Sequence, residues 1–224
     1  MTPAPNFDRL APLYAGLEWI TFGRLLQSCR VAMLPHVRDC RKVLIVGDGD
    51  GRFLAALLDA LPEALPEVTV DSVDISAGMI ELARKRIGGK EANQKRVRFT
   101  VADIRHDPIP GQDYDLIVTN FLLDCFPAQE LELVIDRLNQ VALPDAKWIV
   151  GDFALPQTPW KRWLSRLVLA GMYVFFRIVT RLPARSLVDP SPLLKARGWV
   201  PRSETAWLSG FLVSRLWTHG TPSC

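Results

Sequence analysis

The chain has 224 residues, of which 49% are hydrophobic and 23% are charged, and its formal net charge is +3. This length and composition suit one large α/β domain and exclude a disordered or fibrous chain. The small net charge does not indicate nucleic-acid binding, which usually requires a strongly basic face.

Apolar residues at helical spacing predict two helices over residues 7–34, with a break at Gly23 and an end at Pro35. A short apolar run at 43–47 is typical of a strand buried on both faces, and a helix over 53–61 follows it. The predicted strands and helices then alternate through 68–74, 76–87, 97–103, 114–120, 128–142 and 147–153. This alternation predicts right-handed βαβ units and a mostly parallel sheet between two helical layers.

The last part of the chain has a different pattern. A short helix is expected from Ser191 to Gly198, and two β-rich runs joined through Ser209 and Gly210 predict a hairpin that places an antiparallel strand in the sheet. We therefore expect a single-domain, three-layer Rossmann-like α/β/α fold with seven strands. Its predicted parts are an N-terminal helical cap (1–38), a core (40–153), an inserted lid helix after the fifth strand (158–185), and a C-terminal helix with a β-hairpin (186–224).

Cysteine usage and apolar runs indicate a cytoplasmic protein without a metal site. The four cysteines, at 29, 40, 125 and 224, have no metal-ligand spacing, which favours a reducing compartment. The first residues lack a secretory signal pattern. The longest apolar run outside the strands, 167–176, is far shorter than the roughly 20 residues of a membrane-spanning helix.

The first chemical motif is the glycine loop VLIVGDGDGRF after the first strand. Gly47, Gly49 and Gly51 allow positive φ and a close approach of backbone to a ligand, directly before a helix N-terminus. Buried strand-to-helix turns also need glycine for structural reasons. Arg52 and Phe53 stand where a dinucleotide fingerprint would be closed by a small residue, so diphosphate binding is disfavoured.

Two acids end the next strands, at the edge where ligands bind to open parallel sheets. Asp74 is suited to accept hydrogen bonds from both hydroxyls of a ribose, and the alternative is a helix-capping or turn aspartate. Asp103 is suited to accept a hydrogen bond from the exocyclic amine of adenine, with Ile104 packed against the adenine ring. The competing interpretation is a plain turn aspartate.

In their order and spacing over about 40–153, these motifs together resemble the class I S-adenosylmethionine-dependent methyltransferases of the small-molecule type. The motifs are VLIVGDGDG, VDIS with AGMIELARKR, VADI, and YDLIVTN followed by FLLDCF. The opening FDRLAPLY is also similar to the N-terminal cap of such enzymes. The resemblance implies S-adenosylmethionine as cofactor and S-adenosylhomocysteine as product. The cofactor-binding residues implied are Gly47, Asp48, Gly49, Asp50, Gly51, Asp74, Ile75, Met79, Asp103, Ile104, Asn120 and Phe121.

The chain departs from that family at two positions. Ile45 stands where the family usually has an acid, so the cofactor's ammonium group needs another partner, for which Asp48 and Asp50 are candidates. Asp124 stands where many members have a histidine after the fourth strand, and it is the candidate general base, or a helix-capping aspartate. Tyr14 is expected either to close over the cofactor or to pack in the core.

The acceptor side is indicated only by charge. Residues 160–202 carry nine basic side chains and one acid, and Arg162, Arg166, Arg177 and Arg181 line one face of the predicted helix. This pattern favours an anionic lipid surface or an acidic, lipophilic acceptor, while a lid helix with solvent-facing arginines is the alternative.

Three other functions compete with methyl transfer. An aminopropyltransferase using decarboxylated S-adenosylmethionine would need acids after the fourth strand, where this chain has Asn120 and Phe121. A non-catalytic S-adenosylmethionine-binding module is favoured by Ile45, and Arg52 argues against a nicotinamide oxidoreductase. We expect a methyltransferase acting on a small acceptor, with no nucleic-acid partner.

Overall fold

The computed structural model describes residues 23–61, 68–89, 91–156, 160, 163 and 187–220. Tyr14 and the first of the predicted N-terminal helices lie outside the described residues, as does the segment 158–185 apart from Trp160 and Trp163.

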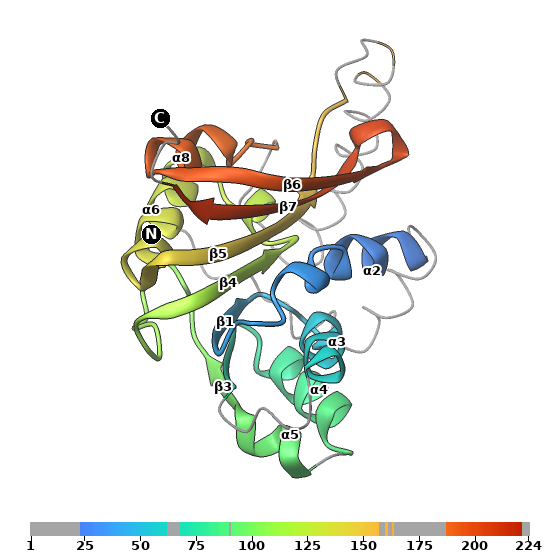
Figure 1. The fold of residues 1–224 in the computed structure, drawn as a ribbon, viewed down its shortest axis with the longest axis vertical. Helices are drawn as coiled ribbons and strands as arrows, with labels where there is room; N and C mark the ends of the chain where they lie inside the picture. Colours follow the sequence, from blue (N-terminus) through green and yellow to red (C-terminus); the bar gives the residue numbers. More distant parts are fainter. Residues whose placement is uncertain are drawn as a thin grey trace.

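Seven strands form one sheet in the order β3-β2-β1-β4-β5-β7-β6 (Figure 1). Their bounds are Lys42–Val46 (β1), Thr69–Asp74 (β2), Val97–Val101 (β3), Tyr114–Asn120 (β4), Ala142–Phe153 (β5), Trp199–Trp207 (β6) and Leu212–His219 (β7). The first five strands pair in parallel, whereas β7 is antiparallel to both β5 and β6. The predicted mostly parallel, seven-stranded sheet is therefore confirmed, together with its C-terminal hairpin.

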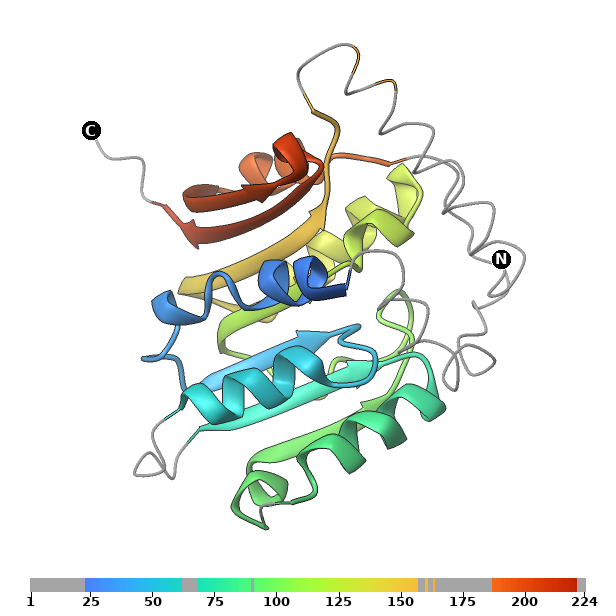
Figure 2. The same cartoon turned by 90° about the vertical axis from the view of Figure 1, so that its right-hand side faces the viewer.

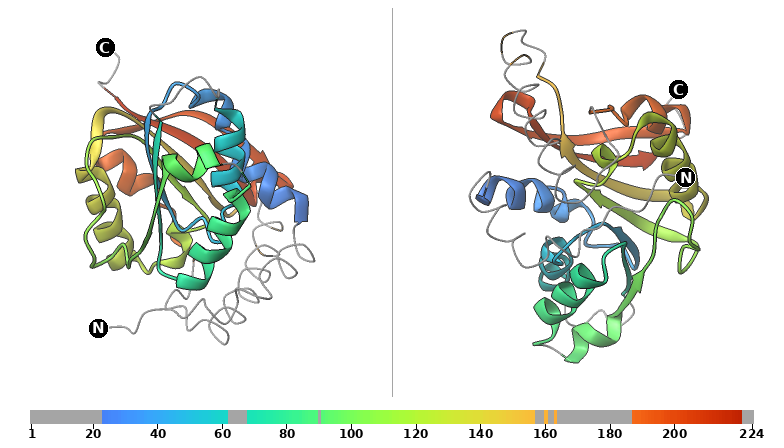
Figure 3. Two further views of the ribbon diagram at one scale, coloured as in Figure 1. Left: turned by 90° about the horizontal axis from the view of Figure 1, so that it is seen from below. Right: turned by 180° about the vertical axis from the view of Figure 1, so that it is seen from behind.

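Helices cover both faces of the sheet. Figure 2 shows α2, α3 and α4 in front of it, and the view from below in Figure 3 places α3 and α4 on one side and α6 on the other. The α-helices are Gly23–Val31 (α2), Arg52–Ala60 (α3), Ala77–Ile87 (α4), Glu91–Arg96 (α5), Ala128–Gln140 (α6) and Ser191–Ala196 (α8). Three 3₁₀ turns are Leu34–His36 (η1), Leu123–Cys125 (η2) and Leu208–Gly210 (η3).

The alternation of side chains along β1 explains its position in the middle layer. Val43 and Ile45 belong to the apolar cluster that includes α3, while Leu44 and Val46 belong to the cluster that includes α6. Successive residues of a strand point to opposite faces, so both faces of β1 are buried. The uninterrupted apolar run in the sequence has this structural cause.

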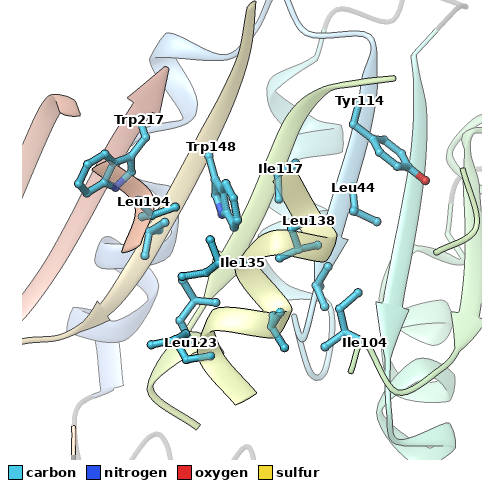
Figure 4. Packing of buried hydrophobic residues seen from close by; sticks show 14 of the residues in the cluster. Leu44, Ile104, Tyr114, Ile117, Leu123, Ile135, Leu138, Trp148, Leu194 and Trp217 are labelled. Atoms are coloured by element: carbon cyan, nitrogen blue, oxygen red, sulfur yellow. The ribbon is translucent and has the colours of Figure 1, made fainter. Parts of the chain in front are cut away.

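Figure 4 shows the core on the α6 side of the sheet. Leu44, Ile117 and Trp148, from three neighbouring strands, belong to one cluster with Ile135 and Leu138 of α6. All five are fully buried, and each such side chain contributes about 1.5 to 3 kcal/mol relative to its exposed state. This core fixes the strands whose C-terminal ends carry the predicted site.

The strand order places the switch point between β1 and β4. The chain runs outward from β1 through β2 to β3, and then returns to β4 on the other side of β1. Ligands of such sheets bind beyond the carboxyl ends of the strands at this point. The glycine loop after β1 and Asn120 at the end of β4 both lie there. In the described part of the chain, no helix has the length and apolar character needed to span a membrane.

Candidate functional site

The glycine loop folds as its composition predicts. Gly47, Gly49 and Gly51 have φ values of 70°, 61° and 80°, which side chains with a Cβ rarely adopt. A Cβ on Gly51 would also lie 2.8 Å from the Cα of Ala83 in α4. The loop thus packs its backbone directly on a neighbouring helix, and glycine is required there for space as well as for φ.

Asp48 caps the helix that follows the loop. Its Oδ1 accepts from the Phe53 amide at 3.1 Å and its Oδ2 from the Leu54 amide at 2.8 Å, both in the first turn of α3. Burial raises the pKa of Asp48 to about 7, although the two amides and Arg30 oppose that shift. To bind the cofactor's ammonium group, the Asp48 carboxylate would have to accept hydrogen bonds from that group as well as from the two amides.

Asp50 lies on the other side of the loop, against two arginines. Its carboxylate pairs with Arg52 at 3.1 Å and with Arg86 of α4 at 2.5 Å. The Arg86 guanidinium also donates to the Asp50 carbonyl, which ties the loop to α4. The ammonium role predicted for Asp50 would compete with both ion pairs.

Asp74 reaches back to the glycine loop from the end of β2. Its Oδ2 accepts from the Gly49 amide at 3.2 Å, and its Oδ1 accepts from the Ser76 amide at 2.9 Å. The Ser76 hydroxyl in turn accepts from the Met79 amide and caps α4, as predicted. The two motifs predicted to hold one ligand are therefore neighbours. Ile75 beside them is half-buried, and Met79 is buried.

Asp103 forms an ion pair that the sequence did not predict. Both of its oxygens accept from the Arg105 guanidinium, and Arg105 is itself buried and also pairs with Glu130 at 2.9 Å. Burial alone would raise the pKa of Asp103, but the Arg105 hydrogen bonds outweigh it and lower the pKa. Ile104 is buried in the α6-side core. An adenine amine would have to share the Asp103 carboxylate with Arg105.

The end of β4 carries two unusual residues. Asn120 is only 4% exposed, and its side-chain N and O have no hydrogen-bond partner among the described residues. Its Oδ1 occupies the space that a Cβ on Gly151 would need. Phe121 has φ +56°, a strained conformation for a bulky residue, and Arg30 lies over its ring at 5.1 Å. Buried unpaired groups and local strain are typical of binding sites.

Asp124 follows on the turn η2 and is 7% exposed. Its Oδ1 accepts weakly from the Cys125 thiol at 3.5 Å, and Cys125 also donates to the Phe121 carbonyl at 3.7 Å. Burial raises the pKa of Asp124 to about 6. A carboxyl group with this pKa is suited to accept a proton near neutral pH.

Two residues of this region escaped the sequence interpretation. Asp152, near the end of β5, is 5% exposed and lies beside Asp124; the rule that selected acids at strand ends would have selected it too. Arg30 of α2 is also buried, and its sequence context gave no signal. Beside them, Phe121, Phe153 and Phe211 form a row of tilted rings, in which neighbouring ring centroids are 5.4 Å apart.

The residues present fit S-adenosylmethionine. The glycine loop turns at positive φ beyond the end of β1, Asp74 lies beside its backbone, and the unpaired amide of Asn120 is at the same sheet edge. Asp124 and Asp152 add carboxyl groups suited to a cationic ligand. Within the described ranges, no group of three or more His, Cys, Asp or Glu side chains is arranged to hold a metal ion.

The sheet order is that of the Rossmann-like α/β fold found in methyltransferases, and comparisons with known proteins agree. Residues 43–145 match the family model described as a methyltransferase domain. A carboxy-S-adenosyl-L-methionine synthase of Chromohalobacter salexigens is 28% identical over 145 residues, covering 64% of this chain and 52% of that protein. A demethylmenaquinone methyltransferase of Roseiflexus sp. is 27% identical over 201 residues, covering 88% of this chain and 75% of that protein.

Solved structures show the same fold. The mitomycin 7-O-methyltransferase MmcR aligns with a TM-score of 0.68 at 15% identity, covering 96% of this chain and 61% of that one. The N-methyltransferase NodS of Bradyrhizobium japonicum, in complex with S-adenosyl-L-homocysteine, aligns with a TM-score of 0.60 at 12% identity, covering 91% and 89%. The chain spans about half the length of the first of these curated relatives. Residues 43–145 thus match a methyltransferase domain, and the fold is similar to that of solved methyltransferases.

Proposed function

We propose that this chain transfers a methyl group from S-adenosylmethionine to a small, lipophilic or anionic acceptor by in-line displacement. The hydrogen bond from the Gly49 amide to Asp74 carries the proposal, because it joins the glycine loop and the ribose acid at the switch point of the sheet. When bound, the cofactor supplies a methyl group activated by a sulfonium centre.

The cofactor-binding residues have distinct roles in this proposal. The backbone of Gly47, Gly49 and Gly51 approaches the methionine part, and the Asp74 carboxylate accepts hydrogen bonds from the ribose hydroxyls. Ile75, Met79, Asp103 and Ile104 form the adenine side, and Asn120 and Phe121 border the methionine end. Asp48 holds the loop to the first turn of α3, and Asp50 holds it to Arg86 of α4.

Positioning supplies most of the rate in this chemistry. Holding the acceptor in line with the methyl group is worth roughly 7 to 11 kcal/mol. Asp124, as general base, adds about 10²- to 10⁴-fold for an acceptor that must lose a proton. Tyr14, outside the described residues, is proposed to close over the cofactor.

The acceptor side is apolar in the described part of the chain. Phe121, Cys125 and Leu155 are half-buried beside the Phe153–Phe211 ring row. Half-exposed apolar side chains around a polar edge favour a lipophilic acceptor. Relatives named for demethylmenaquinone and for malonyl-[acyl-carrier protein] support the same class of acceptor. The buried Arg30 beside this row suits an acceptor with an anionic group.

The insert is proposed to touch an anionic membrane surface from the cytoplasmic side. Trp160 and Trp163 are 65% and 64% exposed, and tryptophan favours membrane–water interfaces. The basic excess of residues 160–202 would add electrostatic attraction. Sedimentation with anionic vesicles should show salt-sensitive association that a Trp160→Ala, Trp163→Ala double variant reduces. Equal sedimentation with neutral vesicles would remove this idea.

Calorimetry with S-adenosylmethionine and S-adenosylhomocysteine, followed by a turnover screen against quinol, phenol and carboxylic-acid acceptors, tests the main proposal. We expect binding of both and formation of S-adenosylhomocysteine with at least one acceptor. Binding without turnover would favour a cofactor-binding module. Methylthioadenosine formed from decarboxylated S-adenosylmethionine would instead show an aminopropyltransferase.

A further inference from the structure

Two buried carboxyl groups lie together at the C-terminal ends of β4 and β5. Asp124 stands on η2 just after β4, and Asp152 stands near the end of the adjacent parallel strand β5. The two groups are near enough for the charge of Asp124 to act on Asp152. Asp152 Oδ1 also accepts from the Phe153 amide at 3.1 Å, whereas its Oδ2 has no geometric partner in the described part of the chain.

Two carboxylates so close together and away from water cannot both remain ionised, because burial and mutual repulsion act in the same direction. Burial raises the pKa of Asp124 to about 6. Burial and then the charge of Asp124 raise the pKa of Asp152 well above its ordinary value. Burial and repulsion therefore favour a pair that carries a single negative charge near neutral pH.

The titratable and charged side chains around Asp124 and Asp152 do not change the charge of the pair. Titratable or charged side chains come from α2, the glycine loop, β2 and η2: Cys29, Arg30, Asp48, Asp74 and Cys125. Burial raises the pKa of Cys29 to about 12 and that of Cys125 well above its ordinary value, so both remain thiols. The Arg30 guanidinium lies over the Phe121 ring and acts on Asp48 and Cys29.

We propose that Asp124 and Asp152 form a proton-sharing dyad, in which protonated Asp152 keeps Asp124 ionised and oriented to take the proton of an acceptor hydroxyl. This inference rests on the proposed methyl transfer and deepens it. The acceptor O–H bond breaks and its proton moves to Asp124. The oxygen electron pair forms the bond to the methyl carbon, and the carbon–sulfur bond breaks with its electrons left on sulfur. Asp152 acts through Asp124 and is a positioning residue.

Proton linkage in cofactor binding tests the dyad without an acceptor. S-adenosylmethionine carries a positive sulfonium and S-adenosylhomocysteine does not, so only the former should draw a proton off a neighbouring dyad. Calorimetry of each ligand near neutral pH, in two buffers with different ionisation enthalpies, gives the protons released on binding. We expect the wild type to release a larger fraction of a proton with S-adenosylmethionine than with S-adenosylhomocysteine.

Asp152→Asn should abolish that difference, because the amide still donates to Asp124 but has no proton to lose. Asp124→Asn should abolish it as well. The matched control is Asp145→Asn, an exposed position at the opposite end of β5, which should behave as the wild type. Equal proton release for both ligands in the wild type, with both ligands bound, overturns the dyad and leaves the proposed function intact. Absence of binding by either ligand overturns the proposed function instead.

The protein without ligand gives a second readout. A raised pKa in the folded state means that the stabilising contribution of the Asp152 proton is complete below the ordinary carboxyl pKa. That contribution is lost as pH rises toward the folded pKa. The stability of Asp152→Asn relative to the wild type should therefore increase as pH rises. The ratio of the two unfolding equilibrium constants should change by up to about tenfold per pH unit. Parallel pH profiles for the two proteins would contradict a proton held at Asp152. If Asp152→Asn does not fold, the same comparison is made with Asp124→Asn.

Discussion

The tight contact between Gly51 and α4 makes Gly51→Ala a demanding test of the structure. The residue has φ +80°, and an added Cβ would lie 2.7 Å from the Ala83 Cβ and 2.8 Å from its Cα. A left-handed conformation costs a residue with a Cβ roughly 1 to 2 kcal/mol. Overpacking against a backbone atom adds about 1 to 3 kcal/mol. We expect the free energy of unfolding to fall by about 2 to 5 kcal/mol in total.

Gly210→Ala separates the two parts of this cost. Gly210 has φ +89°, but nothing lies within 4 Å of its Cβ position, so only the conformational part of about 1 to 2 kcal/mol remains. Gly47→Ala falls between the two, because its Cβ would meet the Leu122 Cδ1, the movable end of a side chain. Urea unfolding of the three variants, with unchanged m-values, measures the order. A Gly51→Ala variant no less stable than Gly210→Ala would refute the packing of the loop on α4.

Four further expectations concern charged side chains in and around the site. Asp74→Ala should weaken S-adenosylhomocysteine binding by about 1.5 to 3 kcal/mol in calorimetry, with Asp145→Ala unchanged. The raised pKa of Asp48 predicts a contribution to stability that is lost as pH rises from about 4 toward about 7, and Asp48→Asn should flatten that part of the unfolding profile. Arg105→Met should destabilise the fold by about 1.5 to 3 kcal/mol in denaturant titration, because it removes the charged hydrogen bonds of this buried guanidinium to Asp103 and Glu130. Lys85→Ala, in an exposed pair, should change stability by less than about 0.5 kcal/mol.

Elements with a strong apolar pattern were predictable, and those without one were not. The strand Tyr114–Asn120 has the predicted bounds because its residues are mostly buried. The helix Glu91–Arg96 was not predicted, since its sequence EANQKR has no apolar periodicity. The strand β5 begins at Ala142 rather than at 147, with a shift in register after its first pair. The exposed Pro144 and Asp145 hide this start in the sequence.

The site was predictable as a set of strand-end residues, but not as a set of interactions. Asp48 reaches amides five and six residues ahead only because the glycines at positive φ fold the loop back on α3. The pairing of Asp103 with Arg105 depends on a rotamer and on burial, neither of which a sequence contains. Asp152 and Asp124 are far apart in sequence and meet only because β4 and β5 are neighbours.

The two ends of strands β4 and β5 differ in a way that folding alone does not require. At the start of β4, the Tyr114 hydroxyl donates to Asp71 at 2.6 Å, and Arg98 completes the pairing of that carboxylate. At the other end, one cross-strand row through Gly151 carries the unpaired buried side chains of Asn120 and Ser214. Unpaired polar groups reduce stability, and they persist where a ligand completes the contacts. The difference in polar pairing therefore supports the proposed position of the site, independently of any motif.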